Sequence, residues 1–134
     1  FELEQALLSG GLEPGDVPAA WNDKFQNFFH MTPPSDRLGC LQDIHWPSGN
    51  FGYFPTYSLG ALTAAQLFAA IRRDIPAWSE LVARGEFERL IGWLGERVHG
   101  WGSRFSAQEL IEKATGAPLS TIAFKAHLKV RYLV

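Results

Sequence analysis

The chain has 134 residues, of which 46% are hydrophobic, 13% aromatic and 19% charged, as is typical of a folded globular domain. This composition excludes a disordered, collagenous or coiled-coil protein. The formal net charge of −2 lacks the basic surface that a nucleic-acid backbone requires, so no nucleic acid is expected as a partner. The longest apolar run, residues 59–71, is too polar to span a bilayer, so no membrane partner is expected, and the single cysteine suits a reducing, cytoplasmic compartment.

Helical spacing of apolar residues begins at the first residues of the chain. Residues 1–8 are predicted to form a helix with Leu3 and Leu7 on one face. Because no N-cap residue precedes them, the chain is expected to begin inside a longer protein. A second helix is predicted to start at Asp16, whose side chain can cap it, with Pro18 in its first turn. Its aromatic face is expected to fill a core and consists of Trp21, Phe25, Phe28 and Phe29.

Residues 30–54 interrupt the helical pattern. They contain Pro33, Pro34 and Pro47, which are incompatible with a continuous helix, and only residues 38–46 could make a short helical turn. An irregular stretch of this length inside a folded domain is uncommon and is usually functional or disordered. Its aromatic content argues against disorder. We therefore predict one long ordered loop, called the motif loop below, that builds a surface.

The remainder of the chain is strongly helical. A long, mostly buried helix is predicted over residues 55–73, followed by shorter helices over 76–85 and 87–100. Ser106 and Glu109 have the spacing of a capping box, which predicts a helix from there to residue 116. A last helix is predicted from residue 120. With neither a strand pair nor a repeat, the sequence predicts an all-α fold of about six helices within a single helical region, residues 1–134.

No common catalytic motif is complete in this sequence. It has no H-E-x-x-H metal pair, no phosphate-binding glycine loop, no dinucleotide fingerprint and no G-x-S-x-G elbow. The four histidines do not have a spacing that places two imidazoles on one helical face, so no metal ligand is predicted in this chain. Cys40 lies near His45, which suggests a thiol nucleophile, but an isolated cysteine beside an apolar residue is more often packed.

Two adjacent segments carry a family resemblance. Residues 39–46 read G-C-L-Q-D-I-H-W, and residues 51–57 read F-G-Y-F-P-T-Y. The first segment matches G-x-x-Q-D-x-H-W, a signature of the carboxypeptidase Taq family of metal-dependent carboxypeptidases, at every fixed position. The second resembles the stretch that follows the signature in that family, and residues 59–60 and 64–66 resemble its next helix. The resemblance covers the whole chain, as the C-terminal part of a longer enzyme.

The resemblance implies a fold and an activity. Family members are mostly helical peptidases with a deep groove, and they remove single residues from the C-terminus of peptides with zinc or a related divalent ion. Their metal ligands lie on an H-E-x-x-H helix and a later glutamate, upstream of the region matched here. The resemblance therefore implies a peptide substrate, a metal in the intact enzyme, and a fragment that alone neither holds the metal nor hydrolyses peptides. It also implies contact with the remainder of the polypeptide and, since members are commonly dimers, a homodimer.

The same resemblance implies roles for three residues of this chain. When water attacks a peptide carbonyl, negative charge develops on the oxygen, and a fixed hydrogen-bond donor lowers the barrier. Related helical zinc peptidases place a histidine and, several residues later, tyrosines opposite the metal. By this likeness Tyr53 is the transition-state donor, His45 is a donor to a substrate carbonyl or carboxylate, and Tyr57 is a weaker substrate contact. Which of His45 and Tyr53 is the main oxyanion donor stays open.

Structural alternatives exist for the motif residues. Without the resemblance, His45 is more often a hydrogen-bonded structural histidine, and Tyr53 a half-buried aromatic residue with its hydroxyl satisfied. Asp43 could fix an imidazole or a backbone turn. Gln42 is a candidate for substrate binding and equally for bridging backbone groups.

The remaining motif positions have weaker functional expectations. Gly39 and Trp46 are interpreted as structural, with Trp46 packed under the loop. Arg37 is the nearest candidate for binding the free carboxylate of a substrate, although a solvated arginine is the more common case.

A second function class fits the same residues. The aromatic loop could belong to a noncatalytic helical module that binds a peptide or a partner protein. Both hypotheses predict a concave surface lined by His45, Tyr53 and Tyr57. An upstream H-E-x-x-H followed by a ligand glutamate would favour the enzyme, and an upstream region without these ligands would favour the binding module.

Overall fold

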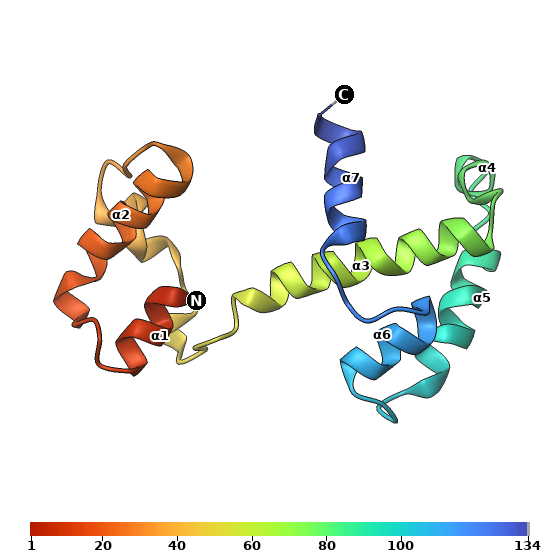
Figure 1. The fold of residues 1–134 in the computed structure, drawn as a ribbon, viewed down its shortest axis with the longest axis horizontal. Helices are drawn as coiled ribbons and strands as arrows, with labels where there is room; N and C mark the ends of the chain where they lie inside the picture. Colours follow the sequence, from red (N-terminus) through yellow and green to blue (C-terminus); the bar gives the residue numbers. More distant parts are fainter. Residues whose placement is uncertain (134) are drawn as a thin grey trace. The chain divides into compact units, whose positions relative to one another are not determined.

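The structure, a computed structural model, describes residues 1–133, and the regular secondary structure of that range is helical (Figure 1). The described residues contain no strand, which confirms the all-α prediction, and they form seven α-helices where about six were expected. The helices are α1 (Glu2–Leu8), α2 (Val17–Phe29), α3 (Pro55–Asp74), α4 (Trp78–Ala83), α5 (Glu88–Arg97), α6 (Ala107–Thr115) and α7 (Ile122–Tyr132). No described helix has the length and apolar character that crossing a membrane requires.

The chain divides into two units, residues 1–56 and the residues from 57 onward. The first unit contains α1, α2 and the motif loop. Its buried residues come from all three parts and include Leu3, Val17 and Cys40. An ion pair between Lys24 and Glu2 joins α2 to α1. The motif loop is therefore held by the two helices that precede it in the sequence.

Asp16 precedes α2 as predicted, but it does not cap the helix. Its side chain makes no capping hydrogen bond, and its backbone is helical, with φ −93° and ψ −6°. An N-cap side chain usually reaches the helix amides from an extended backbone. Here a 3₁₀ turn, Pro14–Asp16, leads directly into α2. The predicted cap is wrong because that turn gives Asp16 the backbone conformation of the helix itself.

The aromatic face of α2 is only partly internal. Trp21 and Phe25 are partly buried and stack on each other, with ring centroids 6.3 Å apart. Phe28 and Phe29 are more than half exposed. The prediction that all four rings fill a core is therefore wrong for the last two, although the Phe29 ring still contacts the Phe25 ring, with centroids 4.8 Å apart.

The second unit has its own hydrophobic core. The core is formed by α3, α4, α5 and α6 and consists of Ala70, Ile71, Ile75, Leu81, Trp93 and Ala114. Helix α3 was predicted to be mostly buried. Its first turns are not, because Tyr57 and Leu59 are half or more exposed, and the fully buried positions lie from Gln66 onward. The burial of α3 follows the position of α4 to α6, which cover only its later turns.

Gln66 links α3 by hydrogen bonds to the end of α6 and the segment between α6 and α7. Its buried amide nitrogen Nε2 donates to Thr115 Oγ1 at 3.1 Å and to the carbonyl oxygens of Ala117 and Pro118 at 2.9 and 3.1 Å. Its Oε1 accepts the backbone N–H of Ser120 at 3.0 Å. Burying a side-chain amide is unfavourable unless its polar atoms form hydrogen bonds, and here both Nε2 and Oε1 have partners.

The predicted capping box at the start of α6 is confirmed. The Ser106 hydroxyl accepts the backbone N–H of Glu109 at 3.4 Å, and the Glu109 carboxylate accepts the backbone N–H of Ser106 at 2.9 Å. The hydrogen bonds from Ser106 lower the pKa of Glu109 below its ordinary value. Gly116 ends the helix with φ +85°, a backbone conformation that glycine adopts without steric cost.

Asp74 is a hydrogen-bonded carboxylate of the second unit. Its carboxylate accepts hydrogen bonds from Arg73 Nε at 2.8 Å and Trp93 Nε1 at 2.9 Å. Both bonds lower the pKa of Asp74 below its ordinary value of 3.8, and the bond from Arg73 has the larger effect. A carboxyl group with a lowered pKa in the fold stabilises it above its unfolded-state pKa, and this stabilisation is lost as the pH falls through the lowered value.

We therefore expect the Asp74→Asn variant to have a lower Tm than the parent chain at neutral pH. The difference should shrink as the pH falls below 3.8, because protonation then removes the same charge from the parent chain. Thermal denaturation followed by circular dichroism checks this. The matched Asp23→Asn variant changes an exposed position of α2 and should have the Tm of the parent chain at each pH. A Tm difference for Asp74→Asn that does not change with pH would contradict the prediction.

Candidate functional site

The motif loop is built from short 3₁₀ turns. The turns are Asp36–Leu38, Cys40–Gln42 and Trp46–Ser48, so the predicted helical turn over residues 38–46 is divided into separate pieces. Cys40 is buried, as expected for a packed cysteine. A Cβ atom on Gly39 would lie 3.1 Å from Pro33 Cβ and 3.2 Å from the Ser35 carbonyl oxygen. Gly39 therefore permits a close approach of two parts of the loop, which supports its structural interpretation.

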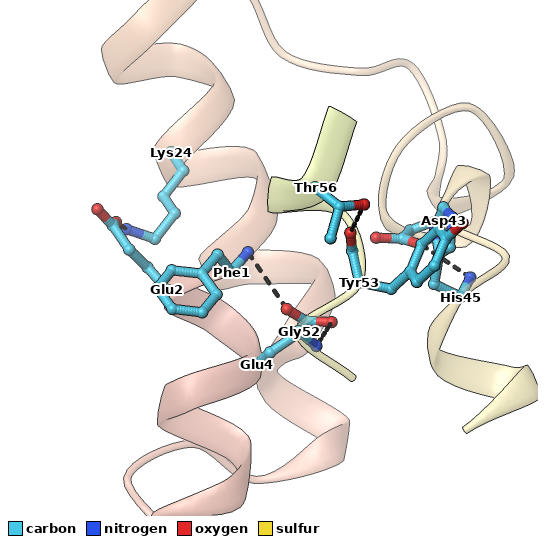
Figure 2. Close-up of polar contacts among 9 residues, drawn as sticks. All are labelled: Phe1, Glu2, Glu4, Lys24, Asp43, His45, Gly52, Tyr53 and Thr56. Carbon is cyan, nitrogen blue, oxygen red and sulfur yellow. Dashed lines mark hydrogen bonds and ion pairs between the residues drawn. The ribbon is translucent and has the colours of Figure 1, made fainter. Parts of the chain in front are cut away.

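Asp43 holds His45 by two contacts. Its Oδ1 accepts the backbone N–H of His45 at 2.9 Å and lies 2.7 Å from His45 Nδ1 (Figure 2). Only 8% of the Asp43 side chain and 14% of the His45 side chain are exposed. The sequence left open whether Asp43 fixes an imidazole or a backbone turn, and it does both.

The Asp43 contact determines how His45 can donate. A carboxylate only accepts hydrogen bonds, so Nδ1 is the protonated nitrogen of this pair. In a neutral ring, Nε2 would then be an acceptor. A donor role for Nε2 therefore requires a proton on both ring nitrogens.

Tyr53 stacks on His45. The two ring centroids are 5.3 Å apart with an interplanar angle of 24°, and Phe54 meets the His45 ring edge-on at 5.3 Å. The Tyr53 residue is 48% exposed, so its ring is not enclosed. Its carbonyl oxygen accepts the Thr56 hydroxyl at 2.6 Å and the Thr56 N–H at 3.0 Å. The structure thus brings two of the predicted site residues together in one anchored ring pair.

Glu4 also supports this pair and was missed by sequence reasoning. It lies on α1, is 2% exposed, and its Oε1 accepts the backbone N–H of Gly52 at 3.2 Å (Figure 2). Gly52 has φ +73° and directly precedes Tyr53. The available signal was the position of Glu4 between Leu3 and Leu7, on the apolar face of the first predicted helix.

Of the other predicted residues, some support the loop and some are exposed. Gln42 Nε2 donates to the Arg37 carbonyl oxygen at 2.6 Å and so supports the loop, while Arg37 itself is exposed. Trp46 is partly buried and meets Trp21 edge-on, with ring centroids 6.3 Å apart, as expected for packing under the loop. Tyr57 is exposed and is the first residue of the second unit, whereas His45 and Tyr53 belong to the first.

The first unit contains an aromatic cavity of about 400 Å³. Its apolar wall is formed by Phe1, Leu3, Trp21, Phe25, Phe28, Phe29, Trp46 and Phe54. Polar groups on the wall are Glu2, Lys24 and Asp43, and the hydrogen bond from Lys24 lowers the pKa of Glu2. The concave surface predicted from the sequence was lined by His45, Tyr53 and Tyr57, and none of these three residues lines this cavity.

The described residues do not fit a metal ion. No three histidine, cysteine, aspartate or glutamate side chains within residues 1–133 converge as a metal site requires. The Tyr53 hydroxyl and the His45 ring are groups of this site that can form hydrogen bonds to a ligand.

Comparisons with known proteins identify relatives over the whole chain. The chain is 41% identical to thermostable carboxypeptidase 1 of Pyrococcus furiosus over 133 residues, which are 99% of this chain and 27% of that protein. It is also 41% identical to carboxypeptidase 1 of Bacillus subtilis over 134 residues, 25% of that protein. The chain therefore spans about a quarter of the length of these relatives.

Solved structures agree with the sequence comparison. Metallocarboxypeptidase 1 of Trypanosoma cruzi superposes with a TM-score of 0.92 at 37% identity, covering 99% of this chain and 28% of that one. A Pyrococcus furiosus carboxypeptidase superposes with a TM-score of 0.93 at 40% identity, covering 98% of this chain and 26% of that one. Residues 1–132 match the family described as carboxypeptidase Taq (M32) metallopeptidase. The predicted resemblance is confirmed, and the chain belongs to the carboxypeptidase Taq (M32) metallopeptidase family.

Proposed function

We propose that this chain is the C-terminal part of a metal-dependent carboxypeptidase that removes C-terminal residues from peptides. Its membership of a metallopeptidase family and its similarity to proteins named carboxypeptidases support this proposal. In the proposed enzyme, zinc or a similar divalent ion is held by residues outside this chain. The chain itself supplies substrate and transition-state contacts.

The stacked pair of His45 and Tyr53 carries the proposal. Its ring centroids are 5.3 Å apart, Asp43 contacts the imidazole, and the Tyr53 residue is 48% exposed. A donor that is held in place by its surroundings needs no reorganisation when charge develops on a substrate oxygen. In our proposal Tyr53 donates its hydroxyl hydrogen to the carbonyl oxygen of the scissile bond, and the His45 ring donates to a second carbonyl or to the terminal carboxylate.

Three exposed residues complete the proposed substrate contacts. Tyr57 is a further hydroxyl donor, and Arg37 is a candidate for the free carboxylate because a guanidinium can bind both of its oxygens. Gln42 is proposed to act mainly through its hydrogen bond to the Arg37 carbonyl, which fixes the backbone there. We further propose that the enzyme is a cytoplasmic homodimer, a location that suits the single, buried cysteine of this chain.

The noncatalytic alternative has one observation in its favour. The aromatic cavity of the first unit, at about 400 Å³, lies in the size range of pockets that hold small apolar groups. In this alternative the chain belongs to a helical module that binds a peptide or a partner protein. Such a module needs neither metal nor a transition-state donor.

Metal content and peptidase activity distinguish the two functions. We expect the purified 134-residue chain to contain no stoichiometric metal and to release no amino acid from the C-terminus of a test peptide. The full polypeptide that contains it should bind one divalent ion tightly and release C-terminal residues one at a time. Elemental analysis and mass spectrometry of the digests measure both. A full polypeptide without metal or activity would favour the binding module, and one tightly bound zinc in the short chain would contradict our placement of the ligands.

A further inference from the structure

Glu4 is a buried carboxylate that the proposed function does not use. It lies on the inward face of α1 next to Leu3, and only 2% of the residue is exposed. Removing a carboxylate from water is unfavourable unless hydrogen bonds or ion pairs compensate for the lost solvation. Leucine at this position would fill the space without that cost, so the contacts made by the carboxylate are what Glu4 adds to the fold.

One oxygen of Glu4 reaches the motif loop. Its Oε1 accepts the backbone N–H of Gly52 at 3.2 Å, a contact between residues 48 positions apart in the sequence (Figure 2). The second oxygen, Oε2, has no hydrogen-bond partner among the described residues and lies 3.7 Å from the amino group of Phe1. The hydrogen bond to Gly52 is therefore the one by which Glu4 acts on another segment of the described chain.

Gly52 is the point at which the loop turns toward Tyr53. It has φ +73°, which side-chain-bearing residues rarely adopt, and the next residue is Tyr53. The Tyr53 backbone is fixed further by its own N–H, which donates to the Asn50 carbonyl oxygen at 3.3 Å, and by Thr56. Holding the Gly52 N–H thus sets the start of the segment that carries the Tyr53 ring.

The Tyr53 ring, whose backbone is held in this way, packs against the His45 ring. The two ring centroids are 5.3 Å apart, and Asp43 holds His45 separately through Nδ1. A shift of the Gly52 turn would therefore move Tyr53 relative to a histidine whose own position is fixed separately.

We propose that Glu4 is a positioning residue that holds the Gly52 turn and thereby sets the placement of Tyr53 against His45. Glu4 acts through the Gly52 backbone and does not touch substrate. The proposal deepens the proposed function and rests on it for its catalytic meaning, because the pair that Glu4 positions is the proposed donor pair. The hydrogen bond itself can be tested without metal or activity.

Amide hydrogen exchange by NMR on the 134-residue chain tests the proposal. Glu4→Leu removes the acceptor, and we expect the Gly52 amide to exchange about tenfold faster or more, since a hydrogen bond to a charged group contributes roughly 1.5–3 kcal/mol. The ring signals of Tyr53 and His45 should shift with it. Glu4→Gln keeps a carbonyl oxygen at the same reach and should restore both readouts. The matched control is Gln5→Leu, the same substitution at the neighbouring exposed position, which should leave Gly52 unchanged.

A second variant, Glu4→Asp, tests the proposal if the Glu4→Leu chain does not fold. Glu4→Asp retains the carboxylate, but its side chain is one methylene shorter and no longer reaches Gly52. The Gly52 amide should therefore exchange faster, while the amides of the second unit keep their exchange rates. Unchanged Gly52 exchange and unchanged Tyr53 and His45 signals in a folded Glu4→Leu or Glu4→Asp chain would overturn the proposal. These readouts are separate from turnover, so failure of the donor role of Tyr53 would leave the result at Gly52 standing, and the reverse also holds.

Discussion

Replacing Tyr53 with phenylalanine in the intact enzyme should lower kcat by about 10²–10³-fold with little change in fold or metal content. The substitution removes the hydroxyl and keeps a ring that can stack on His45 at the same place. The loss corresponds to about 2.7–4 kcal/mol, the typical effect of removing one preorganised donor from an oxyanion site. Because the donor acts mainly when charge develops, KM should change much less than kcat.

Steady-state kinetics with a peptide substrate, together with metal analysis and circular dichroism, measure this effect. The matched control is Tyr132→Phe, the same change at an exposed position on α7, and it should have the kinetics of the parent enzyme. Parent-like turnover in the Tyr53 variant would remove Tyr53 from the catalytic step. Loss of metal in that variant would instead indicate a role in holding the ion.

The second large effect is expected for His45→Phe, which should lower kcat/KM by about 10–100-fold. A hydrogen bond to a charged group such as the terminal carboxylate of the substrate contributes roughly 1.5–3 kcal/mol, and phenylalanine removes both ring nitrogens while preserving an aromatic ring beside Tyr53. The variant also leaves the Asp43 carboxylate, 8% exposed, with the backbone N–H at position 45 but without its imidazole partner. A reduced Tm is therefore expected together with the kinetic loss.

The stability effect and the donor effect can be separated. Asp43→Ala should also reduce kcat/KM, but less than His45→Phe, because the imidazole remains and only its orientation is lost. His99→Phe changes an exposed histidine of the second unit and should have no kinetic effect. If Asp43→Ala lowered both Tm and kcat/KM while His45→Phe left kcat/KM unchanged, His45 would be structural and the donor role would be wrong.

Local sequence patterns predicted the features that depend on neighbouring residues. The helices follow from apolar spacing, and the Ser106–Glu109 capping box follows from a separation of three residues. The contact between Asp43 and His45 was anticipated as one of two alternatives, because two residues of separation allow a side chain to reach the following backbone and ring. The structure stacks the His45 ring on the Tyr53 ring, and the roles of both residues in a site stay predictions.

Features that depend on distant segments were not predictable from these patterns. Glu4 meets Gly52 across 48 residues, and Gln66 meets residues 115–120 across about 50, so neither contact has a local signature. The exposure of Phe28 and Phe29 was missed for the same reason, because helical spacing shows which face is apolar but not which element covers it. Asp16 was misjudged because the backbone of the preceding turn overrides the side-chain preference.

We propose that the side chains of Tyr53 and His45 reach a substrate held at a metal that another part of the polypeptide binds. A crystal structure of the intact enzyme with its metal and a nonhydrolysable peptide tests this most directly. Our account predicts that the Tyr53 hydroxyl lies about 2.7–3.1 Å from the oxygen that replaces the scissile carbonyl, with His45 Nε2 facing the same peptide. A structure in which other parts of the polypeptide cover both rings, or in which they face away from the bound peptide, would contradict it.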